Sequence, residues 1–342
     1  MRSGLLGELI HGHCLKLGFV ADTFVGNCLI AMYSAFGDMN AARVVLDGAP
    51  WRSVVSWTVL ISGYAKVGDV ESARLMFDEA PVKDRGVWGS MIGYVQNSCF
   101  KEGLHMFRLM QLAGVELDEA VFASILCASA NLGALETGIW VHRYLDRVEF
   151  PRSVRLGTAL IDMYAKWGHL DLAENVFEEM PQRDTVCWNA MISGWAMHGN
   201  GDRALQMFSE MEKAGIRPDD ITFIAVFTAC GYSAMAYEGL RVFSSMCNVY
   251  HIEPKTEHYG CMIDFLGRTG LIEEAKEIIG KMPKKKSSPS EEAVLWRALM
   301  SACSSHGNIR LGEVAAEKLL ELVCHSGAYV LLSNLYSTFW RT

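Results

Sequence analysis

The sequence repeats itself every 31 to 36 residues. A pair of bulky apolar residues recurs along the chain, and the spacings between successive second members are 31, 31, 34, 35, 31, 35 and 36 residues. The pairs are Leu29-Ile30, Leu60-Ile61, Met91-Ile92, Ile125-Leu126, Leu160-Ile161, Met191-Ile192, Val226-Phe227 and Met262-Ile263. Periods of this length are typical of solenoids, in which each repeat buries its apolar face only against its neighbours. The repeat therefore predicts one extended array that acts through the surface its repeats line up.

Two small residues follow the apolar pairs at fixed distances. Glycine stands seven residues after the second member at Gly37, Gly68, Gly133, Gly168, Gly199 and Gly270. Alanine or glycine stands twelve residues after it at Ala42, Ala73, Gly138, Ala173, Ala204, Gly239 and Ala275. Glycine often ends a helix, and a small side chain leaves room for a close helix neighbour. These positions predict a turn in each repeat, followed by a second helix that packs closely.

Residues 185–219 show the organisation of one repeat. The apolar residues of the first expected helix recur at helical spacing: Val186, Trp188, Met191, Ile192 and Trp195. The segment 197–201 breaks that helix, and a second amphipathic stretch runs from Asp202 to the stop at Pro218. Aromatic residues at equivalent places in the second helices are expected in the core: Phe77, Phe107, Phe177, Phe208 and Phe243. Each repeat is thus predicted to be a helix, a turn and a helix.

Composition limits the class of protein. Hydrophobic residues make up 51% of the chain, which is enough for a continuous core between stacked repeats. The longest apolar stretch, residues 221–230, is far shorter than the roughly 20 residues that span a bilayer, so we expect a soluble chain without membrane contact. The ten cysteines include no Cys-x-x-Cys pair, which favours free, buried thiols over a disulfide framework. Three of them stand next to apolar pairs: Cys28, Cys230 and Cys261.

The net charge is −8, from 31 basic and 39 acidic residues. Non-specific affinity for nucleic acid comes mainly from neutralised phosphates and needs a basic surface. The overall charge therefore counts against such binding, unless charges of opposite sign are segregated between the faces of the array.

Several stretches resemble a known family. Four of them, at residues 29–33, 160–166, 188–194 and 257–264, are similar to the first-helix consensus of plant pentatricopeptide repeat (PPR) proteins. Repeats of alternating length, and the segments 295–299, 306–308 and 328–336, resemble the PLS subclass with its C-terminal E-type extension. The resemblance covers almost the whole chain and implies an all-α fold, a right-handed superhelical solenoid of helix-turn-helix repeats.

The register divides the chain into eleven repeats or parts of repeats. Residues 1–22 are expected to hold only the second helix of a repeat, and residues 325–342 a truncated second extension repeat. Full repeats are expected at residues 23–53, 54–84, 85–118, 119–153, 154–184, 185–219, 220–255 and 256–290, with an extension repeat at 291–324. The Lys- and Ser-rich run 284–290 is expected to be an inserted, exposed loop.

The resemblance implies that each repeat binds one base of single-stranded RNA. In the family, the fifth and the last residue of a repeat together read the Watson–Crick edge of the base. Carried over, these pairs are Asn27 with Ser53, Thr58 with Asp84, Thr158 with Asp184, and Asn189 with Asp219. Thr with Asp favours G, Asn with Asp favours U, and Asn with Ser leans to C. The second residue of a repeat packs against the bases, a place that Phe24, Val55, Val186 and Ile221 suit.

Other repeats depart from this code. Gly89, Ala123, Ile224 and Gly260 have no side-chain donor or acceptor at the fifth position. The expected reading from 5′ to 3′ is a pyrimidine, G, two unread bases, G, U and then weak positions. An alternative reading of the polar residues is that they cap helices, since Thr, Asn and Asp favour helix starts.

The sequence contains no complete catalytic motif, so we expect no enzyme activity, no catalytic residues, no cofactor and no metal site. His251-Ile252-Glu253 matches half of the zinc deaminase signature, but no Pro-Cys-x-x-Cys follows. We expect a site-recognition protein for C-to-U editing of organellar RNA. Its partners would be single-stranded RNA and a deaminase-domain protein or editing cofactor that binds the extension.

No Arg- and Ser-rich presequence precedes the repeats, so a mitochondrial or chloroplast location rests on the resemblance alone. Two alternatives stay open. One is a helical-repeat scaffold for other proteins without an RNA role, and the other is a non-functional fragment.

Overall fold

The computed structural model describes residues 2–50, 52–93, 100–282 and 288–322 together with Ser333 and Tyr336; for residues 2–5 it describes the backbone alone. These residues form helices and turns and no strand, which confirms the all-α fold class. The chain divides into two compact units, Met1–Met163 and Tyr164–Thr342. Each unit is described by itself.

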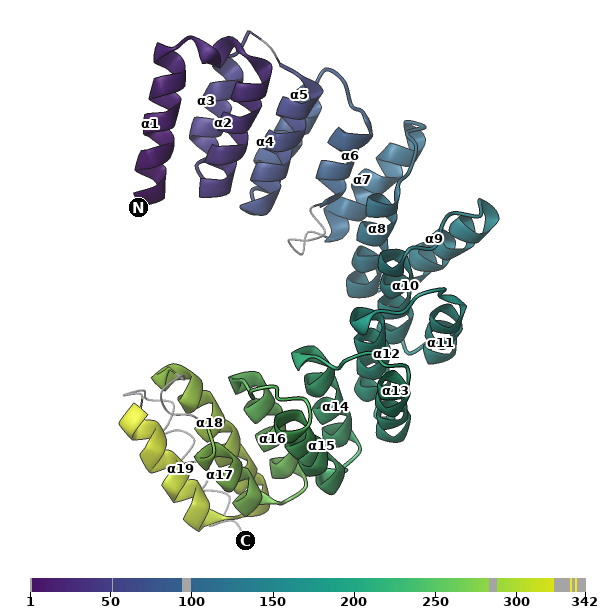
Figure 1. The fold of residues 1–342 in the computed structure, drawn as a ribbon, viewed down its shortest axis with the longest axis vertical. Helices are drawn as coiled ribbons and strands as arrows, with labels where there is room; N and C mark the ends of the chain where they lie inside the picture. Colours follow the sequence, from purple (N-terminus) through teal and green to yellow (C-terminus); the bar gives the residue numbers. More distant parts are fainter. Residues whose placement is uncertain are drawn as a thin grey trace. The chain divides into compact units, whose positions relative to one another are not determined.

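The first unit is a stack of helical hairpins (Figure 1). Its elements are α1 (Arg2–Lys16), the short 3-10 helix η1 (Phe19–Ala21), α2 (Thr23–Phe36), α3 (Met39–Gly48), α4 (Val54–Lys66), α5 (Val70–Glu79), α6 (Arg85–Ile92), α7 (Phe100–Leu112), α8 (Glu119–Leu132) and α9 (Leu135–Arg147). The first helices α2, α4, α6 and α8 pack in one row, each against the next. Each second helix packs against the first helix of its own hairpin, as α3 does on α2 and α5 on α4.

The second unit continues the same pattern (Figure 1). The helix α10 (Val154–Lys166) crosses from the first unit into the second. It is followed by α11 (Leu170–Glu179), α12 (Thr185–Met197), α13 (Gly201–Lys213), α14 (Asp220–Tyr232), α15 (Ala236–Asn248), α16 (Thr256–Arg268), α17 (Ile272–Gly280), α18 (Pro289–His306) and α19 (Ile309–Leu322). Here α12, α14, α16 and α18 form the row of first helices.

The predicted turn glycines all adopt a backbone conformation that L residues disfavour. Their φ angles lie between 72° and 81°: Gly37, Gly68, Gly133, Gly168, Gly199 and Gly270. Glycine tolerates this left-handed region without steric cost, so it ends each first helix sharply. In the repeat that begins with α14, which has no glycine here, Ala234 holds the same place and still has φ 53°. The stacking of the hairpins therefore imposes the turn, whichever residue is present.

The small residues of the second helices lie where a neighbouring helix comes close. Ala42, Ala73, Ala173, Ala204 and Ala275 are completely buried. The two glycines of this set stand where the next helix brings a large side chain. A Cβ on Gly138 would lie 2.8 Å from Met163 Sδ, and one on Gly239 would lie 2.6 Å from Phe265 Cζ. A methyl group at either glycine would therefore require the Met163 or Phe265 side chain to move.

The predicted aromatic residues are buried, and most pack against the fourth residue of the next first helix. Phe77 meets Trp88 and Phe177 meets Trp188, each with ring centroids 4.7 Å apart in an edge-to-face arrangement. Phe208 and Phe243 meet the equivalent aromatics at 5.9 Å and 5.8 Å. These contacts link each hairpin to the next, and aromatic pairs of this geometry add about 0.5–1.5 kcal/mol beyond their burial.

The cysteines next to the apolar pairs and the predicted loop at 284–290 differ in part from expectation. Cys28 is exposed rather than buried, whereas Cys230 is buried and Cys261 lies between these extremes. The helix α18 begins at Pro289, inside the predicted loop, because Ser288 accepts a hydrogen bond from Glu291 N and Glu291 caps Ser288 in return. Residues 283–287 and most of 325–342 lie outside the described residues. No helix in the described part of the chain is long and apolar enough to cross a bilayer.

Candidate nucleic-acid interface

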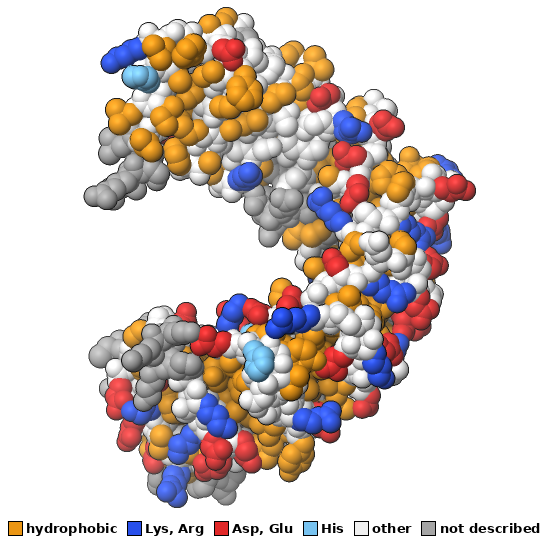
Figure 2. Space-filling model, viewed as in Figure 1, with side chains coloured by type: hydrophobic (Ala, Val, Ile, Leu, Met, Phe, Trp, Pro, Cys, Tyr) orange, Lys and Arg blue, Asp and Glu red, His pale blue; other side chains and the backbone are white. Residues whose placement is uncertain are grey.

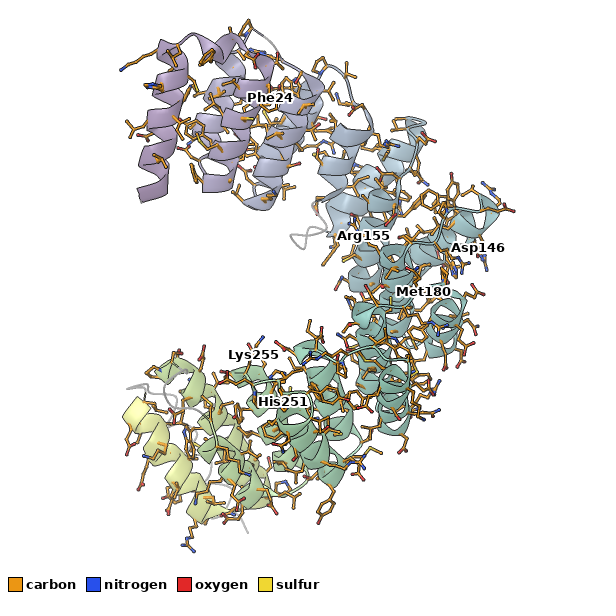
Figure 3. All side chains as sticks on the ribbon, viewed as in Figure 1. Phe24, Asp146, Arg155, Met180, His251 and Lys255 are labelled. Carbon is orange, nitrogen blue, oxygen red and sulfur yellow. The ribbon has the colours of Figure 1, made fainter. Side chains whose placement is uncertain are left out.

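The second residues of four first helices expose large apolar side chains. The exposed fractions are 75% for Phe24 on α2, 56% for Val55 on α4, 58% for Val186 on α12 and 60% for Ile221 on α14. Figure 3 labels Phe24, and Figure 2 shows hydrophobic side chains gathered over α1–α5 on the face in view. Because α2 packs on α4, and α12 on α14, equivalent residues of neighbouring helices repeat along one edge of each unit.

The last residue of each predicted pair caps the next first helix. Ser53 accepts a hydrogen bond from Ser56 N, and Asp84, Asp184 and Asp219 accept one from the backbone N–H three residues on. Each aspartate uses its Oδ1 atom for this bond. The capping role that the sequence left as an alternative is therefore present at all four positions. It places the carboxylates of Asp184 and Asp219 at the start of their first helices, two residues before the exposed Val186 and Ile221.

The pair Asn189 and Asp219 forms a closed ring of hydrogen bonds with Thr222. Asn189 Nδ2 donates to Asp219 Oδ1 at 3.0 Å, and Thr222 Oγ1 donates to Asn189 Oδ1 at 2.6 Å. The backbone N–H of Asp219 donates to Thr222 Oγ1 at 3.0 Å, and that of Thr222 donates to Asp219 Oδ1 at 2.9 Å. The Asn189 side chain is only 5% exposed as a result.

The ring also determines the charge state of its carboxylate. Burial by itself raises the pKa of Asp219, but this is outweighed by hydrogen bonds from the Thr222 backbone, the Asn189 amide and the Thr222 hydroxyl. The pKa of Asp219 is therefore lowered from its ordinary value, and the group is a carboxylate at neutral pH. A carboxylate only accepts hydrogen bonds, so the amide of Asn189 must turn its NH₂ group toward Asp219.

The pair Asn27 and Ser53 is joined in the same way through Ser56. Ser56 Oγ donates to Asn27 Oδ1 at 2.7 Å and lies 2.8 Å from Ser53 Oγ. Since the Ser56 proton goes to Asn27, the proton between the two serines comes from Ser53. Two repeats that lie in different units thus build the same bridge from the fifth residue to the last.

The threonine pairs are arranged differently. Thr58 Oγ1 donates to its own backbone at Val54 O, 2.9 Å away. Asp84 Oδ1 and Thr58 Oγ1 lie 3.4 Å and 3.8 Å from the place a Cβ on Gly86 would take, so both border the second residue of the next repeat. Thr158 likewise donates to Val154 O at 2.8 Å. Its predicted partner, Asp184, belongs to the other unit.

The third residue of each first helix is the feature that the sequence analysis missed. This position is half-buried at Val25 of α2 and buried at seven others: Ser56, Val87, Val121, Leu156, Cys187, Thr222 and His258. Ser56 and Thr222 follow the two asparagine repeats, and Val87 follows a threonine repeat. His258 donates to Asp220 O and accepts from Lys255 N, so its ring fills the position without a free polar atom. The sequence did contain a signal for this position: polar residues occur there in some repeats, whereas other repeats have apolar residues.

The half motif at His251 forms no site. His251 is exposed in the connection between α15 and α16, with φ 55°, and Figure 3 labels it near Lys255. Lys255 forms an ion pair with Asp220 at the start of α14. No group of three His, Cys, Asp or Glu residues that could hold a metal ion occurs among the described residues.

Comparisons with known proteins agree with this architecture. The profile of the PPR repeat family matches residues 183–231, and that of the PPR repeat matches residues 55–83, 88–115, 158–184 and 257–287. A pentatricopeptide repeat-containing protein of Arabidopsis thaliana is 44% identical over 334 residues, which are 97% of this chain and 62% of the relative. The chloroplastic protein ELI1 and a mitochondrial relative, both from the same plant, are each 43% identical over 97% and 91% of the chain.

A solved structure shows the same fold. The crystal structure of the pentatricopeptide repeat protein PPR10 from maize superposes with a TM-score of 0.61 at 19% identity, covering 97% of this chain and 56% of that protein. The chain also spans only part of its curated relatives, 52% of ELI1 and 45% of the mitochondrial relative. With the helical hairpins, the turn glycines and these matches in agreement, the chain is built from pentatricopeptide repeats.

Proposed function

We propose that this chain binds single-stranded RNA and reads one base per repeat. The observation that carries the proposal is the Asn189–Asp219 pair, which joins the fifth and the last residue of one repeat directly beside the exposed Ile221. Sequence-specific RNA recognition needs an apolar surface against which unstacked bases pack and polar groups that reach the Watson–Crick edge. The exposed Ile221 supports the first role, and the neighbouring Asn189–Asp219 pair is our candidate for the second. Proteins of this family bind RNA and are generally not enzymes, so we expect recognition without catalysis.

The threonine repeats suit guanine. Since the proton of Thr58 is donated to Val54 O, the hydroxyl offers its lone pairs to a ligand, and the nearby Asp84 carboxylate is also an acceptor. Guanine is the base that presents two neighbouring N–H donors, at N1 and N2, on its Watson–Crick edge. An asparagine amide still carries both a donor and an acceptor, which suits a pyrimidine.

The net charge of −8 favours binding through bases over binding through phosphates. The more phosphates a protein neutralises, the more steeply its affinity falls with salt, so a protein that neutralises few is expected to show a shallow dependence on salt. We therefore expect a marked preference for the cognate sequence and weak binding to RNA of unrelated sequence.

A base-substitution panel tests the proposal. The probe is a single-stranded RNA with the core CGAAGU flanked by adenosines, and the base opposite Asn189 is varied through all four nucleotides. Wild-type protein is expected to prefer U there, and Asn189→Thr is expected to move the preference to G, with a change in relative affinity of about tenfold, as one to two hydrogen bonds imply. Asn200→Thr, which keeps a helix cap on α13, is the matched control and is expected to change nothing.

If the Asn189→Thr protein retains the wild-type preference, base reading by this pair is wrong. If no RNA of the panel binds at modest salt, the RNA-binding proposal itself is wrong. A scaffold for protein partners would then be the better interpretation, in keeping with the acidic charge.

We further propose that the RNA is an organellar transcript and that binding directs C-to-U editing by a deaminase that another protein supplies. Support comes from relatives named chloroplastic or mitochondrial and from the segment after residue 290, which resembles an E-type extension. The test mixes this chain, a deaminase-domain protein and an RNA with a cytidine 3′ of the CGAAGU core. Conversion of that cytidine that requires the chain supports editing. Intact binding without conversion, with a deaminase active on its own target, contradicts it.

A further inference from the structure

Three of the five buried polar side chains among the described residues, Ser56, Thr222 and His258, occupy the same place in different repeats, and two of the three carry a hydroxyl. Ser56 and Thr222 are each the third residue of a first helix and are completely buried. The equivalent places in other repeats hold apolar side chains such as Val87, Val121 and Leu156. Burying a hydroxyl is unfavourable unless it forms hydrogen bonds, so a specific partner must account for each.

That partner is an asparagine at the fifth position of the preceding repeat. Thr222 donates to Asn189 at 2.6 Å and Ser56 donates to Asn27 at 2.7 Å. Among the predicted reading pairs in the described residues, these are the two with asparagine. The repeat that contains Thr58 is followed by one with Val87 at this place, and Thr58 donates its proton to its own backbone instead.

We propose that the buried hydroxyl of the following repeat, Thr222 or Ser56, is a third specificity-determining residue that positions the reading asparagine. The inference rests on the proposed RNA binding. An asparagine amide can turn over and exchange its donor and acceptor, which would confuse uracil with cytosine because their edges differ in donor and acceptor order. The hydroxyl holds the carboxamide oxygen and thereby fixes which edge of the amide faces the RNA.

The last residue sets the direction of this bridge. Asp219 is an acceptor only, so the Asn189 NH₂ group points to it, and the Thr222 hydroxyl lies between two acceptors, Asn189 Oδ1 at 2.6 Å and Asp219 Oδ1 at 2.9 Å, of which the first is the shorter contact. Ser53 both donates and accepts, and the chain Ser53–Ser56–Asn27 can reverse all its protons without breaking a bond. The amide at Asn27 is therefore held in place and yet able to turn over. The structure thus assigns strict uracil reading to Asn189 and relaxed pyrimidine reading to Asn27.

The experiment measures base preference with the full chain and the CGAAGU probe. Thr222→Val keeps the shape of the side chain and removes the hydroxyl. The ratio of U to C affinity opposite Asn189 is expected to fall about three- to tenfold, the value of one hydrogen bond. Affinity for the probe with C at that place is expected to change less than twofold. Thr222→Ser, which restores the hydroxyl, is expected to recover the wild-type ratio.

Thr228→Val is the matched control. It makes the same substitution in the same helix at a hydroxyl that bonds to Ile224 O, and it is expected to leave the ratio unchanged. A merely structural role for Thr222 would lower affinity for every probe alike and leave the ratio intact. Ser56→Ala provides a second variant in the other unit, with an expected loss of affinity for both pyrimidines and no change in their ratio.

The outcomes separate this inference from the proposed function. If the wild-type protein prefers U and Thr222→Val keeps the full U to C ratio, the positioning role is overturned while RNA reading stands. If the wild-type protein shows no preference opposite Asn189, the proposed function fails and this inference fails with it.

Discussion

A close approach of two first helices in the second unit predicts a large effect from one methyl group. A Cβ on Gly194 of α12 would lie 2.7 Å from the Cβ of Ala165 on α10, and 3.8 Å from its Cα. Carbon atoms in contact lie about 3.5–4.0 Å apart, so Gly194→Ala requires the helices to separate by about 1 Å. Neither methyl group has a rotatable bond that would let it move aside.

The magnitude follows from two opposing effects. Alanine is a better helix former than glycine by about 1 kcal/mol, which favours the variant. Overpacking of a tight interface costs about 1–3 kcal/mol, and a contact between two Cβ atoms, which can only separate if the backbones move, belongs at the upper end. The free energy of unfolding is therefore expected to fall by about 1–2 kcal/mol in Gly194→Ala. Urea denaturation followed by circular dichroism at 222 nm measures it.

Two companion variants test the reasoning. Gly89→Ala makes the same change in α6, where the new Cβ meets nothing within 4 Å, and is expected to raise stability by up to about 1 kcal/mol. Adding Ala165→Gly to Gly194→Ala exchanges the two residues and restores one methyl group between the helices. This double variant is expected to return within about 0.5 kcal/mol of wild type. If Gly194→Ala stabilises the protein as Gly89→Ala does, close approach of the helices is not what requires glycine.

Two further predictions concern titratable groups. Burial raises the pKa of the Cys230 thiol to about 12 and that of the Cys303 thiol to about 11. Iodoacetamide at pH 8 is therefore expected to modify the exposed Cys28 before these two, which peptide mass spectrometry would measure. Equal rates of modification at all three cysteines would contradict the buried packing. The lowered pKa of Asp219 means that its contribution to stability is complete above the ordinary carboxyl pKa of about 3.9 and is lost as the pH falls through the lower folded value. The difference in stability between wild type and Asp219→Asn is therefore expected to shrink below pH 4 in urea titrations, and a constant difference would refute a depressed pKa.

The turns could be predicted from sequence because they depend on counting alone. Seven residues after the apolar pair, the first helix has completed its last turn over the neighbouring hairpin, and the chain must reverse there. Glycine marks this place in six repeats, and Ala234 shows that the conformation persists where glycine is absent. The second residues stand five and six residues before the apolar pair, which turns them roughly 140° and 240° around the helix from it, so their side chains face away from the buried pair.

Proximity to the apolar pair was a poorer guide to burial. Cys230 follows Val226 by four residues and shares its helix face, so it is buried. Cys28 directly precedes Leu29, and neighbouring residues of a helix point about 100° apart, which leaves Cys28 exposed. Angular position on the helix, rather than distance along the chain, decides the outcome.

The hydrogen-bond rings could not be predicted from the pattern of single repeats. Each ring joins the fifth residue of one repeat to the cap and the third residue of the next, as Asn189, Asp219 and Thr222 do. A repeat consensus describes each position within one repeat and does not pair positions of successive repeats. A threonine at the third position is also ordinary near the start of a helix. Only the packing of α12 on α14 shows that the three side chains meet.

The residues proposed to read one base come from two successive repeats. The cap residue that would contact a base belongs to the helix start of the following repeat, and so does the hydroxyl that holds the asparagine amide. An asparagine moved into the repeat of Thr58 would face Val87, which has no hydroxyl to fix its orientation, and its oxygen would be buried beside a methyl group. If the proposed base reading holds, base preference at one nucleotide is a property of the junction between two repeats, and exchanging a single repeat is expected to alter the preference at its neighbour as well.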